Sequence, residues 1–178
     1  MFGNIKSLKS HSKSAIVAAG LLALAALPST VEAATGPFAA LSGSWSGGGT
    51  ITMSSGAKER IRCRARYNVG GAGSNLDLTL RCASDSYNFE LQSNASYSNG
   101  AVSGTWSETT RGVGGSIAGS GNAGQIRVRV SGIISASLAV STAANQQSIS
   151  IQAPGTEMQN VAISLSRKQT VQVTSLAK

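Results

Sequence analysis

The stretch from Glu59 to Ala83 constrains the fold more than any other part of this 178-residue chain. Residues i and i+2 of a β-strand point to the same face of the sheet. Every second residue in the first half of the stretch is an arginine: Arg60, Arg62, Arg64 and Arg66. The residues between them are mostly apolar, and a second alternating segment with three leucines follows a glycine-rich turn at 70–74. The pattern therefore predicts two strands, each with one apolar face.

The two cysteines of the chain, Cys63 and Cys82, fix the register of this hairpin. A fold-back centred in 71–74 places them opposite each other and also leaves every apolar residue on one face. Agreement between independent constraints of this kind favours the register strongly. Opposite Cβ atoms lie about 4.5–5.5 Å apart, slightly farther than a disulfide prefers. We therefore expect a disulfide that forms either at a non-hydrogen-bonded pair or through local twist of the strands.

The other face of the hairpin is basic. The register places Arg81 beside Arg64, Thr79 beside Arg66 and Asp85 beside Arg60. An arginine fork matches phosphate or carboxylate groups, so the face is a candidate site for an anionic surface. A solvated face that protects the sheet and keeps the protein soluble is the open alternative. The candidate anion-binding residues are Arg60, Arg62, Arg64, Arg66 and Arg81.

Residues 1–33 have the pattern of a secretory signal peptide. Three lysines precede an apolar segment at 15–27, which is too short to span a bilayer, and Val31-Glu32-Ala33 forms a cleavage site. We expect a single all-β domain over 34–178, located in the periplasm or secreted, where a disulfide can form. Removing 1–33 would change the net charge from +8 to +6 and would remove His11, the only histidine.

Several kinds of chemistry are not expected in the exported chain. Without a histidine, histidine-based catalysis and zinc binding are excluded, and no Gly-x-x-x-x-Gly-Lys loop for a nucleotide occurs. We therefore predict no enzymatic activity, no metal and no cofactor. Export argues against a nucleic-acid partner and favours an anionic envelope component. Aromatic residues make up only 4% of the chain, which is too few for the aromatic girdles of a membrane-spanning barrel. The sequence does not predict the oligomeric state.

Short alternating segments continue to the end of the chain, separated by turn residues. The predicted strands are 42–53, 59–67, 75–83, 86–97, 101–108, a strand around Ile117, 126–130, 133–141, 147–152 and 158–167, and the segment 169–174 is either a further strand or a tail. Asn99-Gly100 predicts a type I′ hairpin turn. The pattern predicts an all-β antiparallel meander of about 8–10 strands closed into a small barrel, with a β-sandwich as the alternative.

The Asn99-Gly100 turn also predicts which way Trp106 and Glu108 point. Its register pairs Leu91 with Glu108, which shares the inward face with Trp106. An inward carboxylate at a barrel end is either a structural ion pair, here with Arg111 or Arg167, or a ligand contact.

Gly43-Ser44-Trp45 in the first strand resembles the Gly-x-Trp that opens lipocalin-like (calycin) and avidin-like barrels. Much of the chain resembles an uncharacterised family of secreted bacterial proteins. The resemblance implies that Trp45 closes the barrel floor against Arg167 of the last strand. It also implies an interior that binds a small apolar or amphipathic molecule. Candidate ligand contacts are Trp45, Trp106, Glu108 and Arg167. The alternative function is a non-enzymatic cell-envelope interaction protein, for example one like a protease inhibitor, that uses the arginine face.

Overall fold

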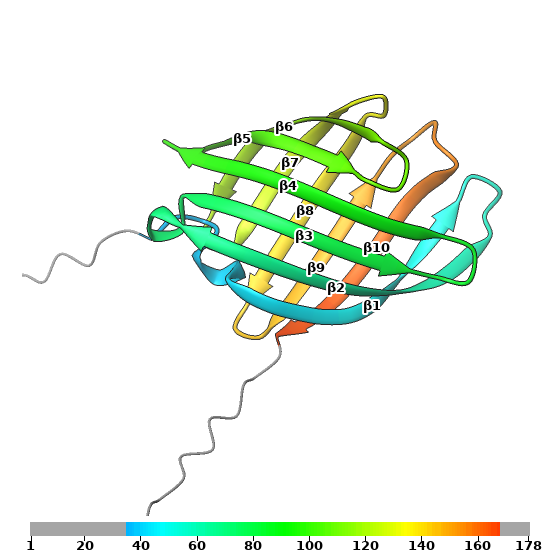
Figure 1. Cartoon of the computed structure of the whole chain (residues 1–178), viewed down its shortest axis with the longest axis horizontal. Coiled ribbons are helices and arrows are strands. Elements are labelled where there is room, and N and C mark those ends of the chain that lie inside the picture. Colours follow the sequence, from blue (N-terminus) through cyan, green and yellow to red (C-terminus); the bar gives the residue numbers. More distant parts are fainter. Residues whose placement is uncertain (1–34, 168–178) are drawn as a thin grey trace, which may run out of the picture. The chain divides into compact units, whose positions relative to one another are not determined.

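The computed structural model describes residues 35–167 as a closed antiparallel barrel (Figure 1). Its ten strands follow one another around the barrel in chain order, and β1 pairs with β10 to close it. The predicted meander barrel is therefore confirmed, and the β-sandwich is not formed. The predicted signal peptide and the segment 169–174 lie outside the described residues.

The strand bounds agree with the sequence pattern to within a few residues. The elements are η1 (Ala39–Leu41), β1 (Gly43–Met53), β2 (Lys58–Gly70), η2 (Gly71–Gly73), β3 (Asn75–Ala83), β4 (Asn88–Ser98), β5 (Ala101–Glu108), β6 (Val113–Asn122), β7 (Gln125–Gly132), β8 (Ala136–Ala143), β9 (Gln146–Gln152) and β10 (Met158–Arg167). Among the described residues, no helix is both long and apolar enough to cross a membrane.

The β2–β3 hairpin has the predicted register. Cys63 pairs with Cys82, Arg64 with Arg81 and Tyr67 with Leu78. The two cysteines form a disulfide whose Cα atoms are 4.1 Å apart, as expected for a narrow, non-hydrogen-bonded pair. The apolar face and the arginine face are thus on opposite sides of the sheet.

Two details of the sequence prediction are wrong. Asp85 does not pair with Arg60, because the ladder between β2 and β3 ends at Ala83. The following residues instead form a turn in which the Ser84 amide donates to the Tyr87 carbonyl at 2.8 Å. Ile134 was predicted within a strand, but β8 begins only at Ala136 and the Ile134 side chain is exposed.

The Asn99-Gly100 turn is confirmed. Both residues have positive φ, 49° and 86°, as a type I′ turn requires. The register that it sets pairs Leu91 with Glu108 and Ser93 with Trp106. Glu108 and Trp106 are both buried, so they lie on the inner face as predicted.

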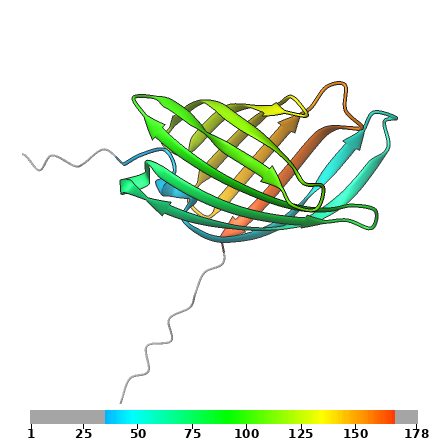
Figure 2. The same cartoon turned by 45° about the horizontal axis from the view of Figure 1, so that its top comes forward.

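Glycines on β1 and β6 let the barrel bend sharply. A Cβ on Gly49 would lie 2.1 Å from the Ala162 carbonyl oxygen of β10, and one on Gly119 equally close to the Arg127 carbonyl oxygen of β7. Only glycine permits such a close approach of two strands. In Figures 1 and 2, the green strands β2–β4 lie across the yellow and orange strands β8–β10, and the long β1 curves from one layer to the other.

One end of the barrel is closed by the segment 36–41. The Gly36 amide donates to the Ala72 carbonyl at 2.8 Å, and the Gly124 amide donates to the Pro37 carbonyl at 3.2 Å. The segment is thus hydrogen-bonded to two of the turns at this end. Phe38 and Leu41 are each only 1% exposed. They fill the barrel end and form its floor.

The disulfide should contribute measurably to stability. Replacing Cys63 and Cys82 together by alanine should lower the free energy of unfolding by about 2–4 kcal/mol, because the bridge closes a loop with a sequence separation of 19 and restricts the unfolded chain. Urea unfolding of the variant and of wild type, each with and without reductant, tests this. Reductant should lower the stability of wild type and leave the variant unchanged. Two free thiols in the exported, non-reduced protein would contradict the assignment.

Candidate functional site

The interior of the barrel is lined by apolar residues, some fully buried and some half-buried. At the floor, Trp45 and Leu165 are each 1% exposed and Val102 is 2% exposed. Other apolar residues with the same inward parity are only half-buried and pack against this core. They include Leu78, Leu80, Ile117, Leu138, Val140, Ile151 and Val161. Ile51 and Ile61, toward the end opposite the floor, are also buried, at 0% and 3% exposed, so the residual solvent-accessible area is confined to part of the inward-facing set.

Trp45 and Arg167 hold the floor in place. The Trp45 indole nitrogen donates to the Leu41 carbonyl at 2.7 Å, and the Arg167 guanidinium lies 4.7 Å from the centroid of the Trp45 ring. Arg167 also donates to the Ala40 carbonyl at 2.5 Å. This tryptophan–arginine contact was expected from the resemblance. Both side chains contact the segment 36–41, and their predicted role as ligand contacts stays a prediction.

A polar cluster spans the interior above the floor. The Tyr67 hydroxyl on β2 donates to Gln147 Oε1 on β9 at 2.8 Å, and Gln147 Nε2 donates to Thr142 Oγ1 at 3.1 Å. Burial raises the pKa of Tyr67 far above its usual value, so the phenol stays neutral. This cluster was not predicted from the sequence. The sequence feature that could have indicated the cluster is Gln147, a polar residue in phase with the apolar Ile149 and Ile151.

Glu108 organises the turn between β5 and β6. Its Oε1 accepts from the Glu90 amide and from the amide and hydroxyl of Thr110, and its Oε2 accepts from the amide and guanidinium of Arg111. Of the two predicted partners, Arg111 pairs with it at 3.4 Å. Burial alone would raise the pKa of Glu108, but the Thr110 hydroxyl and the backbone amides outweigh it and lower the pKa to about 2. All of these contacts are within the chain, and the predicted role of Glu108 as a ligand contact stays a prediction.

The end of the barrel opposite the floor, which we name the mouth, carries aromatic side chains. Tyr87 and Phe89 stack with ring centroids 6.2 Å apart, and the Arg111 guanidinium lies 4.9 Å from the Phe89 centroid. The Tyr87 hydroxyl donates to Glu157 Oε1 at 3.1 Å, which joins the β3–β4 and β9–β10 loops. On the inner wall, Trp106 donates to the Ser131 carbonyl at 3.1 Å.

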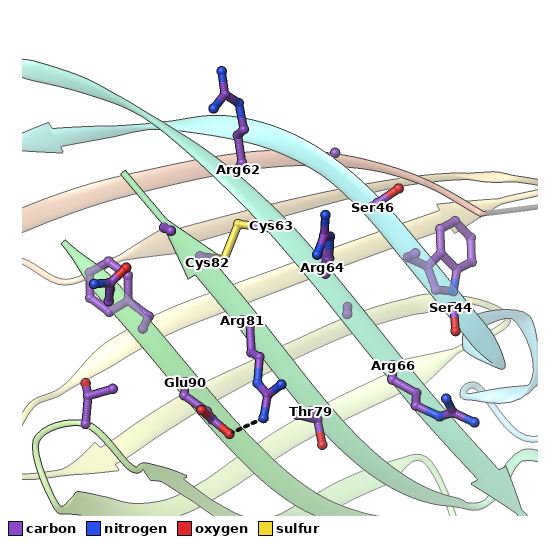
Figure 3. A pocket seen from close by; sticks show the side chains of 17 residues that line it. Ser44, Ser46, Arg62, Cys63, Arg64, Arg66, Thr79, Arg81, Cys82 and Glu90 are labelled. Atoms are coloured by element: carbon purple, nitrogen blue, oxygen red, sulfur yellow. Dashed lines mark hydrogen bonds and ion pairs between the residues drawn. A yellow bond between two sulfur atoms is a disulfide. The ribbon is translucent and has the colours of Figure 1, made fainter. Parts of the chain in front are cut away.

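The outer face of β1–β4 carries a groove of about 1090 Å³. Arg62, Arg64 and Arg66 stand in a row along β2, and Arg81 lies beside them on β3 (Figure 3). Ser44, Ser46 and Thr79 border the row. Four of the five predicted arginines thus line one groove. Arg60 is exposed on the same face but does not line it.

Positive charge in this groove is largely uncompensated. Arg81 forms an ion pair with Glu90 on β4 at 2.9 Å. Within residues 35–167, no carboxylate lies within ion-pair distance of Arg62, Arg64 or Arg66. These three guanidinium groups are therefore free to meet an anion.

Comparison with known proteins supports the architecture. The crystal structure of Rv2717c from M. tuberculosis is similar to this chain, with a TM-score of 0.58 and 14% identity, and the match covers 73% of this chain and 94% of that chain. At this level of identity the likeness shows the fold alone. No protein-family model matches the sequence, and a search of curated proteins finds no significant match.

Replacing Glu108 by glutamine should destabilise the protein by about 1–3 kcal/mol at neutral pH, because buried donors lose their charged acceptor. A lowered folded-state pKa contributes stability above the usual pKa of 4.5, and this is lost as pH falls from there toward about 2. The stability of the variant should therefore change less than that of wild type between these pH values. Urea unfolding across this range measures both effects.

The matched control for this variant is Glu90→Gln, which removes the same charge from an exposed ion pair. It should change the stability by less than about 1 kcal/mol. Equal losses in the two variants would contradict the structural role of Glu108.

Proposed function

We propose that this protein is an exported, non-enzymatic, lipocalin-like barrel that binds a small apolar or amphipathic molecule in its interior. The observation that carries the proposal is the half-buried state of inward apolar residues such as Leu80, Leu91 and Val140, beside a fully buried floor. In a filled interior these side chains would be covered by packing. Water-accessible apolar wall is what a small-molecule site requires.

Polar groups at two levels favour an amphipathic ligand. The Tyr67–Gln147–Thr142 cluster offers hydrogen-bonding groups above the floor, and Arg111 lies at the mouth beside Phe89. A few polar groups in a mostly apolar site commonly orient the ligand. A ligand with an apolar body and an anionic head would place that head at the mouth, near Arg111.

A second candidate function is supported by the outer groove. The uncompensated arginines on β2 favour a cell-envelope protein that contacts an anionic partner. This function does not depend on the interior, so one barrel could perform both.

Two neighbouring residues on β4 provide a test, because Leu91 faces inward and Gln92 faces outward. We expect 1-anilinonaphthalene-8-sulfonate, an amphipathic fluorescent probe, to bind wild type. Leu91→Trp should fill part of the interior and weaken binding at least about tenfold, equivalent to about 1.4 kcal/mol. Gln92→Trp should bind like wild type. Fluorescence titration measures the affinities, and circular dichroism with urea unfolding checks that each variant is folded.

The same variants show whether the interior has room. A filled interior would make Leu91→Trp less stable by about 1–3 kcal/mol through overpacking, and folded wild type would not bind the probe; that result would refute the proposal. Native mass spectrometry of protein isolated from its own host should reveal a non-covalent ligand that is released on unfolding.

A further inference from the structure

The barrel carries arginines on two opposite sides. We name Arg62, Arg64, Arg66 and Arg81 the first arginine face, and Arg127 with Arg129 on β7 the second arginine face. Around the closed ring the strands run β1-β10-β9-β8-β7-β6-β5-β4-β3-β2. β2 and β7 are therefore five strands apart in either direction, which is the largest separation that a ten-stranded ring permits.

Three of the arginines of the first arginine face form a row along β2, with a groove beside them. Alternate residues of a strand are about 7 Å apart, so Arg62, Arg64 and Arg66 present charge at that interval along β2. On β1 their partners are Gly48, Ser46 and Ser44. These side chains are too short to cover the arginines, which leaves a groove along the row.

Like charges meet within this face. Arg64 pairs directly with Arg81 across β2 and β3, an arrangement that destabilises a sheet unless a counter-charge is present. Glu90 reaches Arg81, but no carboxylate reaches Arg64 within the described part of the chain. A bound anion would remove this repulsion, and the free energy gained would appear as affinity.

The second arginine face repeats the arrangement. Arg127 and Arg129 are exposed and line a groove of about 490 Å³. Their partners on β8 are Ala139 and Ser137, again short side chains. The sequence from 109 to 156 contains no aspartate or glutamate. Positive charge on this side is therefore uncompensated as well.

The side chains that line the grooves indicate which class of anionic molecule can bind there. The two aromatic residues lining the first groove, Trp45 and Phe89, belong to the inward-facing set, paired with Ala65 and Cys82. No aromatic surface is thus presented for stacking nucleic-acid bases. Apart from Ala83 and from Glu90, which pairs with Arg81, the outward side chains are arginines with serine, threonine and asparagine. They offer little apolar surface to lipid chains but do offer hydrogen bonds to sugar hydroxyl groups.

We propose that the two arginine faces each bind an extended acidic polysaccharide, so that one barrel can hold two chains on opposite sides. Carboxylate or sulfate groups of the polymer meet the guanidinium forks, and its hydroxyl groups meet the flanking serines and threonines. The proposal concerns the outer surface and stands or falls independently of ligand binding in the interior.

The first experiment measures affinity for defined probes: polygalacturonate, dextran sulfate, neutral dextran, an oligothymidylate and phosphatidylglycerol vesicles. Wild type should bind both acidic polysaccharides, more weakly as salt rises, and should not bind neutral dextran. The triple variant Arg62→Ser/Arg64→Ser/Arg66→Ser should bind about tenfold more weakly. The matched control with lysine at the same positions keeps the charge but loses the fork, so its affinity should fall between the two.

The second experiment tests the two-sided arrangement. Long dextran sulfate chains mixed with wild type should become cross-linked at intermediate ratios, detected by light scattering. Arg127→Ser/Arg129→Ser should still bind a short chain but should no longer cross-link long ones. Circular dichroism and urea unfolding verify that each variant is folded, as expected for exposed positions.

Three results would overturn the proposal. The first is unchanged polysaccharide binding in the triple serine variant. The second is tighter binding of the oligothymidylate or of the vesicles than of either acidic polysaccharide at equal charge concentration. The third is cross-linking that persists in the Arg127→Ser/Arg129→Ser variant, which would show that the second arginine face does not hold a chain.

Discussion

Pairing of β1 with β10 is the constraint on which the rest of this structure depends. It turns a linear meander into a ring, so the backbone groups of the first and last strands are satisfied by each other. The pairing is possible because Gly47 and Gly49 let β1 approach the carbonyls of β10. Closure also brings Arg167 over Trp45 and thereby secures the floor. Without it, the barrel would have two open edges and an unsupported end.

Closure also separates the molecule into an inside and an outside with different chemistry. Along β2, Cys63, Ala65 and Tyr67 are buried while the arginines between them are exposed. One strand therefore contributes simultaneously to the interior wall and to the charged surface. The two proposed binding activities use different faces of the same elements, so each can be altered by mutation with little effect on the other.

The sequence pattern predicted those features that depend on residues close together in the chain. Alternation and turn residues were enough for the strands, for the Cys63–Cys82 register and for the inward position of Glu108, because each depends on neighbours joined by a short turn. Contacts between distant segments were not predictable from pattern. The Tyr67–Gln147 hydrogen bond joins residues 80 positions apart, and it depends on the curvature of the whole ring. Asp85 was misplaced because no alternation signal marks where a ladder gives way to a turn.

The disulfide lies directly behind the charged surface. The Cys63–Cys82 pair occupies the rung next to Arg64 and Arg81, on the opposite side of the sheet. A covalent bond therefore holds together two strands that their own side chains push apart. In a reducing environment that covalent bond would be missing, and only the β2–β3 ladder and the packing of the core would oppose the repulsion. The density of positive charge that this surface can display is thus tied to the redox state of the compartment in which the chain folds.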